Sequence, residues 1–315
     1  MPTPTVSVVT IFLDAERFLE EAIASVRAQT YADWELLLVD DGSTDGSGAI
    51  ARRHAAAEPG RIRYLRHPDG RNHGMSASRN LGVAHARGRY LAFLDADDAY
   101  LPRKLERQVA LLEARPAAAM VYGPTIHWYG WTGRPEDQGR DQPRRLGVPP
   151  DTLVPPPGLV PRFLRGEAQT PGTCGILVRR DAVERVGGFE EAFRGMFEDQ
   201  VFVCKVCLEF PVFVSGESHD RYRQHPASHA RRALAAGATR APGMPSPAYE
   251  RFLTWLEGYV TARDLRDPAL RSALGRELAP YRSRWRGWLA RAKARVRWWR
   301  MVAERRLAER REAWR

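Results

Sequence analysis

The sequence predicts an α/β fold with a mainly parallel sheet flanked by helices and a helical extension at the C-terminus. Two observations predict this class. Short apolar runs alternate with amphipathic helical patterns through the first 125 residues, and such alternation is typical of a parallel sheet covered on both faces. In addition, the three strongest polar clusters directly follow apolar runs, as functional residues do at the carboxyl ends of parallel strands.

Apolar runs predict strands over Val6–Thr10, Trp34–Val39, Ile62–Leu65, Tyr90–Leu94 and Ala118–Tyr122. Between them we expect helices over Asp14–Gln29, from the turn after the second strand to Arg53, over Ser76–Ala86, and from Pro102 to about Ala114. The first helix is amphipathic, with one apolar face made of Phe18, Leu19, Ala22, Ile23 and Val26. Proline at the start of the fourth suits a first helical turn.

The remainder of the chain is less regular. Prolines and glycines between Gly130 and Pro161 predict an irregular excursion. We then expect a strand over Gly175–Val178 and helices over Asp181–Val186, Asp199–Leu208, Tyr249–Thr261 and Pro268–Leu278, with a break at Ala235–Pro247. The predicted domains are residues 1–230, whose halves meet near residue 125, a helical extension over 231–280, and a tail over 281–315.

The positive charge is concentrated in this tail. The net charge is +11 over 315 residues, but residues 281–315 hold thirteen Arg or Lys and three Glu, so the body is close to neutral. Five of the nine tryptophans also lie there, and on a helix they join an apolar stripe beside arginines. Such a helix suits an anionic membrane surface; a packing helix or a partly disordered tail is the alternative. Nucleic acid is not the expected partner because no base-reading module accompanies the charge.

Cysteine usage and the N-terminus point to a cytoplasmic protein. The Cys204–Cys207 spacing resembles half a zinc site, but no second Cys or His pair accompanies it, so two small core residues are the preferred interpretation. The N-terminus has no basic region, and the apolar run Val6–Val9 is too short for the apolar segment of a signal peptide. No window approaches the roughly 18–20 apolar residues of a spanning helix. We expect a cytoplasmic protein, peripheral on the inner face of the membrane.

The most informative segment is the run of acids after the fourth predicted strand. Asp95, Asp97 and Asp98 follow Tyr90–Leu94 directly. Carboxylates two residues apart at a strand end can share a hard divalent cation, which prefers oxygen ligands and keeps phosphates as partners. A loop or helix cap rich in Asp is the alternative.

Two further clusters follow strands. Asp40 and Asp41 precede Gly42, and an acid there can accept hydrogen bonds from a bound nucleotide, although an ordinary capped turn also explains it. The segment from Asn72 to Asn80 opens a helix with Gly and Ser, and its Arg79 can pair with a diphosphate. A surface arginine on a helix is the alternative interpretation.

Taken together, these segments resemble the family 2 glycosyltransferases, which are inverting enzymes with the GT-A fold, a Rossmann-like sheet flanked by helices. The similarity covers roughly residues 5–225. The matching pieces are Ser7–Thr10, Phe18–Tyr31, Trp34–Gly46, Ser78–Gly82 and Gly88–Asp98. Several ordered motifs at the right separations are far more specific than any one of them.

The resemblance implies a role for each matching position. On the nucleotide-sugar side it implies Thr10 against the base, Asp41 bonded to the base, Asp95 at the ribose, Arg79 near the phosphates, and the family positions Glu16 and Asn72. On the acceptor side, Gly187–Phe189 and Phe197–Asp199 resemble the motif whose Asp, here Asp199, is the general base. Asp97 would bind the metal, and His225 could complete its coordination, although a lone His often has a structural role.

One position departs from the family. Where the family has a Tyr-Asn pair after the first strand, this chain has Leu13-Asp14, so Phe12 is the candidate to stack on the base instead. The resemblance implies transfer of a sugar from a nucleotide-diphosphate sugar, with a UDP-sugar favoured, to a hydroxyl of a glycan or lipid-linked acceptor, assisted by Mg²⁺ or Mn²⁺. The alternative is a non-catalytic nucleotide-sugar-binding or scaffold protein tethered by the tail.

Overall fold

The computed structural model describes residues 3–229, 231–232 and 246–283. The chain divides into two compact units, residues 1–225 and residues 226–315. The first unit holds all of the site residues predicted above.

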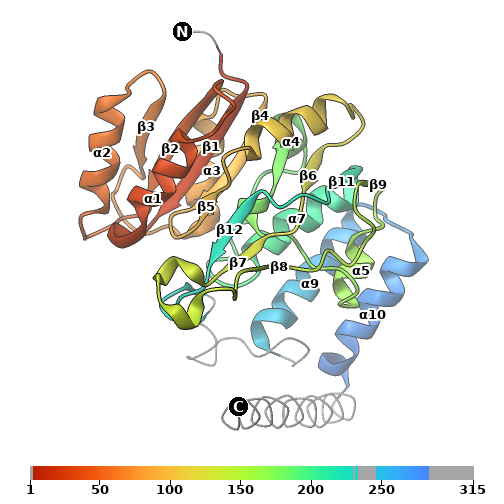
Figure 1. The fold of residues 1–315 in the computed structure, drawn as a ribbon. Helices are drawn as coiled ribbons and strands as arrows, with labels where there is room; N and C mark the ends of the chain where they lie inside the picture. The colour runs from red at the N-terminus through yellow and green to blue at the C-terminus, as the bar shows by residue number, and fades with distance from the viewer. Residues whose placement is uncertain (1–2, 230, 233–245, 284–315) are drawn as a thin grey trace, which may run out of the picture. The chain divides into compact units, whose positions relative to one another are not determined.

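The first unit is built on an eight-stranded sheet (Figure 1). Its strands are β1 (Val6–Phe12), β2 (Trp34–Asp40), β3 (Ile62–Arg66), β4 (Tyr90–Asp95), β6 (Met120–Tyr122), β9 (Thr152–Val154), β10 (Leu177–Arg179) and β11 (Val212–Val214). Their order across the sheet is β3-β2-β1-β4-β10-β6-β11-β9. The pairs among β1 to β4 are parallel, β11 is parallel to β6, and the pairs that β10 makes with β4 and β6 are antiparallel.

Helices pack against this sheet because its central strands are apolar on both faces. Every residue of β1 and β2 is buried, as expected for parallel strands covered on two sides. The helices of this unit are α1 (Glu16–Arg27), α2 (Ser47–Ala57), α3 (Met75–His85), α4 (Lys104–Glu113), α5 (Val160–Leu164), α6 (Arg180–Arg185) and α7 (Glu198–Glu209). Helix α3 contacts β1 and β2, and α7 contacts α3 and α5. The apolar face predicted for α1 is confirmed, since Leu19, Ala22, Ile23 and Val26 are buried.

Strand register brings the polar clusters together at one edge of the sheet. Phe12 lies opposite Asp40 in the β1–β2 pair, and Ile11 lies opposite Asp95 in the β1–β4 pair. The acids that follow β2 and β4 therefore end at the same level as the end of β1. This edge is the carboxyl end of the parallel strands, where α/β folds bind ligands.

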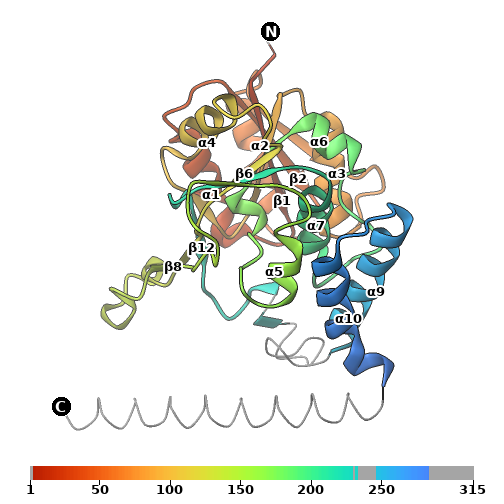
Figure 2. The same ribbon diagram turned by 90° about the vertical axis from the view of Figure 1, so that its right-hand side faces the viewer.

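A second, four-stranded sheet brings residues 220–225 to this edge. Its strands are β5 (Ala99–Tyr100), β7 (Ile126–Trp128), β8 (Gln142–Pro143) and β12 (Asp220–Arg223), in the order β5-β12-β7-β8. Strand β12 runs antiparallel to β5, with Asp220 opposite Tyr100. Since β5 begins directly after Asp98, this pairing brings residues 220–225 beside the acid run. Figure 2 shows β12 and β8 from the side.

Most elements predicted from apolar runs are confirmed to within a few residues. The short strands β5, β7, β8, β9, β11 and β12 and the one-turn helix α5 were not predicted. The segment between Gly130 and Pro161 is mostly irregular, as expected, but it contributes β8 and β9 to the two sheets.

The interpretation of Cys204 and Cys207 as core residues is confirmed. Both thiols are free and buried inside α7, and burial raises the pKa of Cys204 to about 12. A raised pKa keeps the thiol protonated, which is the inert form of cysteine.

The described residues of the second unit include helices α9 (Pro247–Ala262) and α10 (Pro268–Arg282), which pack against each other. Both begin at a side-chain cap: Ser246 accepts from the N–H of Tyr249, and Asp267 from that of Leu270. Helix α10 extends past its predicted end and includes Tyr281, whose hydroxyl bonds the backbone of Ser246. The amphipathic tail predicted from residue 281 onward lies, beyond residue 283, outside the described residues.

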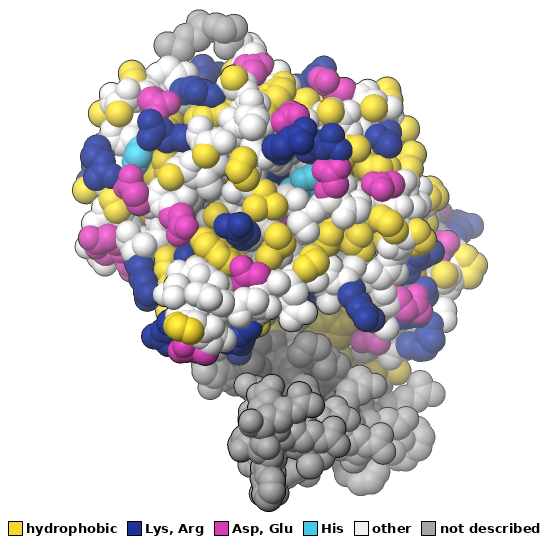
Figure 3. Space-filling model, viewed as in Figure 1, with side chains coloured by type: hydrophobic (Ala, Val, Ile, Leu, Met, Phe, Trp, Pro, Cys, Tyr) yellow, Lys and Arg dark blue, Asp and Glu magenta, His cyan; other side chains and the backbone are white. Residues whose placement is uncertain are grey.

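Surface charge over the described residues is mixed on the face seen in Figure 3, where basic and acidic side chains are interspersed. This agrees with the near-neutral body that the sequence indicates. Within the described part of the chain, none of the helices combines the length and apolar character that crossing a membrane requires.

Candidate active site

The three carboxylates after β4 lie in different surroundings. Asp98 is 1% exposed and accepts a 2.9 Å hydrogen bond from the backbone N–H of Arg223. Burial, followed by the negative charges of Asp97 and Asp95, raises the pKa of Asp98 well above its usual range. The side chains of Asp95 and Asp97 are 32% and 30% exposed. Asp98 is therefore a structural carboxyl group, and the other two are the ones that a ligand can reach.

Asp97 and His225 form a candidate metal-binding pair. His225 Nε2 lies 3.0 Å from Asp97 Oδ2. Phe18 packs against the imidazole, with ring centroids 4.9 Å apart, and holds its plane. On the other side, Arg223 Nε donates a 2.6 Å hydrogen bond to the carbonyl oxygen of Asp97. The pair is thus fixed by its neighbours and partly open to solvent.

The donor types of this pair suit a divalent cation. Carboxylate oxygen and imidazole nitrogen both bind Mn²⁺, and Mg²⁺ accepts the carboxylate while keeping waters and phosphates as its other ligands. No group of three or more His, Cys, Asp or Glu residues arranged to hold a metal occurs among the described residues. Asp97 and His225 therefore fit a cation that takes its remaining ligands from a bound diphosphate and water.

Arg79 differs most from its expected place. It is 1% exposed, donates a 2.7 Å hydrogen bond from Nη2 to Asp95 Oδ1, and places Nη1 3.3 Å from Glu198 Oε1. Burial opposes its charge, but Asp95 and Glu198 raise the pKa of Arg79 above its ordinary value. The physical reason is its position on the buried face of α3, which packs against the sheet and α7. Arg79 ties the end of β4 to the start of α7, and two of its three nitrogens are occupied by protein carboxyl groups.

The acids Glu198 and Asp199 form the first turn of α7. The preceding Phe197 has φ +75°, a backbone conformation that bulky residues rarely adopt, so the surrounding structure must hold it there. Glu198 is 7% exposed, and burial together with the charge of Asp199 raises its pKa to about 8. Burial also raises the pKa of Asp199, against the opposing effect of Arg79.

The two acids differ in access. Glu198 contacts Arg79, whereas Asp199 is partly exposed and accepts one 2.7 Å hydrogen bond at Oδ1 from the backbone N–H of Gln200. A neutral carboxyl group can still accept from Arg79 through its carbonyl oxygen. Arg79 lies closer to Asp95 (2.7 Å) than to Glu198 (3.3 Å). The raising effects of burial and Asp199 on the pKa of Glu198 therefore exceed the lowering effect of Arg79. Near neutral pH the arrangement favours a proton on Glu198.

Asp41 and Thr10, the two residues predicted to face the base, are both buried. Asp41 is 4% exposed, and its carboxylate accepts hydrogen bonds from the backbone N–H groups of His73 (2.8 Å) and Gly74 (3.0 Å). It therefore positions the loop before α3. Thr10 is 1% exposed in β1, and its hydroxyl has no hydrogen-bond partner among the described residues.

Phe12 is not placed to stack on a base. It is 3% exposed and belongs to the hydrophobic core between β1 and α1. The alternation of side chains along β1 accounts for this, because Phe12 shares a face with Val6 and Val8, which lie in the same core cluster. The neighbouring Leu13 is 44% exposed, and Asp14 caps the loop after β2 by accepting a 2.8 Å hydrogen bond from the N–H of Thr44.

Glu16 and Asn72 are both exposed near this edge. Glu16 accepts a 3.0 Å hydrogen bond from the N–H of Gly46, so it fixes the turn after β2. The backbone carbonyl of Asn72 accepts a 2.9 Å hydrogen bond from Arg194, and the Asn72 side chain forms no hydrogen bond with the described residues.

Sequence reasoning missed three residues of this site. Glu198 was treated only as the neighbour of Asp199. Arg223 was passed over beside His225, although it bonds Asp97 and Asp98. Thr173, whose hydroxyl lies 3.3 Å from Asp95 Oδ2, lies in a loop without a motif. Of the three, only Arg223 could have been found from the sequence. It lies two residues before the candidate ligand His225, and in extended backbone residues two apart point to the same face.

Comparison with known proteins identifies the family and the fold of the chain. The model of the glycosyl transferase family 2 matches residues 7–187. The chain is 44% identical over 110 residues to a putative glycosyltransferase, EpsE, of Bacillus subtilis (35% of this chain, 39% of EpsE). It is 32% identical over 243 residues to the O-antigen biosynthesis protein RfbC of Myxococcus xanthus (76% of this chain, 17% of RfbC). The chain thus spans less than half the length of these two relatives.

Solved structures share the fold. Residues 1–349 of TarS from S. aureus, in complex with UDP-GlcNAc, give a TM-score of 0.65 at 17% identity, covering 87% of this chain and 73% of that one. The mannosyltransferase PcManGT from Pyrobaculum calidifontis, in complex with GDP-Man and Mn²⁺, gives 0.53 at 21% identity, covering 93% and 80%. These similarities confirm the predicted GT-A fold. With the family model matching more than half of its residues, the chain belongs to glycosyl transferase family 2.

Proposed function

We propose that the chain is an inverting glycosyltransferase that moves a sugar from a nucleotide-diphosphate sugar, with a UDP-sugar favoured, to a hydroxyl of a glycan or lipid-linked acceptor. One observation carries the proposal: Arg79 joins Asp95, two residues from the Asp97–His225 pair, to Glu198, the neighbour of Asp199. A cation-binding pair and a carboxylate base therefore lie at the same sheet edge. Family membership and the nucleotide-sugar complexes of the structural neighbours support the same reaction class.

Asp97 and His225 are the residues that would hold a divalent cation. When bound, Mg²⁺ or Mn²⁺ supplies positive charge for the leaving diphosphate. The protein's part is to fix the two donors: Arg223 and Phe18 hold them 3.0 Å apart, so little reorganisation is needed when the donor binds.

Asp199 is the proposed general base. It accepts the proton of the acceptor hydroxyl as that oxygen forms a bond to the anomeric carbon, and the bond from this carbon to the diphosphate oxygen breaks. One displacement inverts the anomeric configuration, and the nucleoside diphosphate leaves with the bonding electron pair. Burial raises the pKa of Asp199, and a base whose pKa lies nearer the working pH takes up the proton more readily.

Glu198 and Arg79 are positioning residues in this proposal. With its pKa raised to about 8, Glu198 is mostly protonated at neutral pH, so Asp199 carries the charge of the pair. Arg79 holds Asp95 and Glu198 at either side of it. Loss of either contact would let the first turn of α7 move relative to β4.

The amphipathic pattern of the tail also suggests where the protein is located. We place the protein on the cytoplasmic face of a membrane, held by residues 281–315, on the sequence pattern alone. A lipid-linked acceptor would then lie in the membrane to which the protein is held.

The proposal is tested by assaying purified protein with UDP-sugars and GDP-mannose in the presence of Mn²⁺ or Mg²⁺. We expect release of nucleoside diphosphate from at least one donor, faster with an acceptor, and loss of the release in excess chelator. Binding of a nucleotide sugar without any release, across donors and acceptors, would instead favour the non-catalytic alternative.

A further inference from the structure

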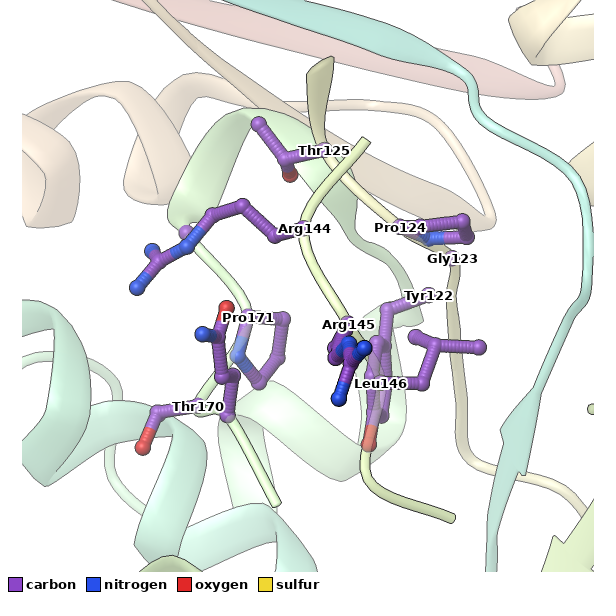
Figure 4. Close-up of a pocket in the computed structure, with 11 residues that line it drawn as sticks. Tyr122, Gly123, Pro124, Thr125, Arg144, Arg145, Leu146, Thr170 and Pro171 are labelled. Atoms are coloured by element: carbon purple, nitrogen blue, oxygen red, sulfur yellow. The ribbon is translucent and has the colours of Figure 1, made fainter. Parts of the chain in front are cut away.

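A pocket in the first unit is rich in unpaired positive charge. It lies between the loop after β6, the segment after β8, and residues 169–172 (Figure 4). Its polar lining comes from Arg144, Arg145, Tyr122, Thr125, Gln169 and Thr170, and no Asp or Glu lines it. A pocket with two guanidinium groups and no carboxylate attracts anions.

Neither arginine has a partner within the described part of the chain. The backbone N–H of Arg144 donates a 2.9 Å hydrogen bond to the carbonyl of Thr125, which fixes the segment. Neither guanidinium group forms a hydrogen bond or ion pair with the described residues, whereas Arg140, in the same excursion, pairs with Asp137. Tyr122 is 1% exposed, and its hydroxyl also lacks a hydrogen-bond partner among the described residues. Buried hydroxyl groups usually have a hydrogen-bond partner, so the Tyr122 hydroxyl is free to donate a hydrogen bond to a bound anion.

The pocket adjoins the reacting groups. Its wall at Gly172 continues directly into Thr173, whose hydroxyl lies 3.3 Å from Asp95 Oδ2. Although Arg144 is exposed at the surface, desolvation lowers its pKa, and Tyr222 and then Asp199 partly offset that effect. In Figure 4 the Arg144 side chain extends towards the segment that carries Thr170 and Pro171.

We propose that Arg144 and Arg145 form an anion subsite that binds a phosphate or carboxylate group of the acceptor and so directs the acceptor hydroxyl to Asp199. The inference rests on the proposed function and names its acceptor class: an anionic chain rather than a neutral sugar. Arginine suits this task because its planar fork donates two parallel hydrogen bonds to either group. The donor diphosphate is assigned elsewhere, to the Asp97–His225 pair.

Anion binding is measured directly, without turnover. Wild-type protein is titrated at low salt, without divalent cation, with three probes: a trigalacturonate, an oligomer of glycerol phosphate, and farnesyl pyrophosphate. These stand for a glycan carboxylate, a glycan phosphodiester and a lipid-linked diphosphate. We expect binding of at least one probe, and a loss of about 10-fold or more in affinity when Arg144→Gln and Arg145→Gln are combined.

The matched control is Arg134→Gln, which removes the same charge from an exposed arginine of the same excursion outside the pocket. It should bind the probes as the wild type does. Equal affinities in the double variant and the wild type, or equal losses in the control, would overturn the subsite.

Kinetic measurements distinguish failure of the anion subsite from failure of the proposed function. With an anionic acceptor that the wild type uses, the double variant should raise the KM for acceptor more than the KM for donor. A larger effect on donor KM would assign the pocket to the donor phosphates and overturn the inference, while leaving the transferase activity intact. Absence of any nucleotide-sugar turnover in the wild type would refute the proposed function, but the titrations would still report on anion binding.

Discussion

Replacing Glu198 with Gln should make the protein more stable at neutral and alkaline pH. Burial and the charge of Asp199 raise the pKa of Glu198 from 4.5 to about 8. The folded state therefore holds this proton more tightly than the unfolded state. The stabilising contribution of the protonated group is fully present below the unfolded-state pKa and is lost as pH rises towards 8.

The magnitude follows from linkage. Each unit of pKa difference corresponds to about 1.36 kcal/mol, so a shift from 4.5 to about 8 corresponds to roughly 5 kcal/mol of lost stability by pH 9. Gln resembles the protonated acid, and its Oε1 can still accept from Arg79, but it does not titrate. The difference in unfolding free energy between Glu198→Gln and wild type should rise with pH by an amount of that order.

Urea denaturation at pH 5, 7 and 9 measures this difference. The control is Glu184→Gln, because its side chain is 64% exposed and its carboxylate lies 3.9 Å from Arg180; a surface pair of this kind contributes little. We expect the Glu198→Gln protein to gain stability relative to wild type with rising pH, and the control to show no such trend. Parallel pH profiles for Glu198→Gln and wild type would refute the assignment of a buried, protonated Glu198.

Three further predictions concern the metal pair, the buried arginine and the tail. Asp97→Ala should lower the divalent-dependent affinity for the donor at least 10-fold, measured by calorimetry with and without Mn²⁺. The unfolding free energy should change little because this side chain is 30% exposed. Unchanged donor binding would contradict the metal role. Arg79→Met should lower the unfolding free energy by about 3 kcal/mol, since it removes a buried guanidinium together with its contacts to Asp95 and Glu198. A change below about 1 kcal/mol in urea denaturation would contradict that. Deleting residues 284–315, which keeps Tyr281 on Ser246, should reduce binding to anionic liposomes in a sedimentation assay, and binding of the full chain should weaken with salt; equal binding would leave the tail as a partner-binding segment.

The central sheet could be predicted from the sequence because its strands are apolar on both faces. Val6–Phe12 and Trp34–Asp40 are buried at every position, so their apolar character is visible without knowledge of their neighbours. The short strands of the second sheet behave differently. Asp220–Arg223 has polar residues and four positions only, and its strand character comes from pairing with β5 and β7.

The site divides in the same way. The acids after β2 and β4 could be predicted because each follows a strong strand signal, and the approach of His225 to Asp97 agrees with the family resemblance. The burial of Arg79, and the raised pKa of Glu198, could not be predicted. Both depend on how α3 and α7 meet, and no local pattern in either helix encodes that contact. Arg144 likewise becomes a candidate only through the pocket that the fold builds around it.

The most direct test of the account is the turnover of Asp199→Asn with the best nucleotide-sugar donor and acceptor. The matched control is Asp181→Asn, because Asp181 also accepts from the next residue's N–H in the first turn of a helix, at 2.8 Å, but is exposed on α6. We predict that kcat falls about 10²-fold or more in Asp199→Asn with little change in donor KM, and that the control keeps wild-type turnover. Near-wild-type kcat in Asp199→Asn, or a comparable loss in Asp181→Asn, would contradict the assignment of Asp199 as the general base.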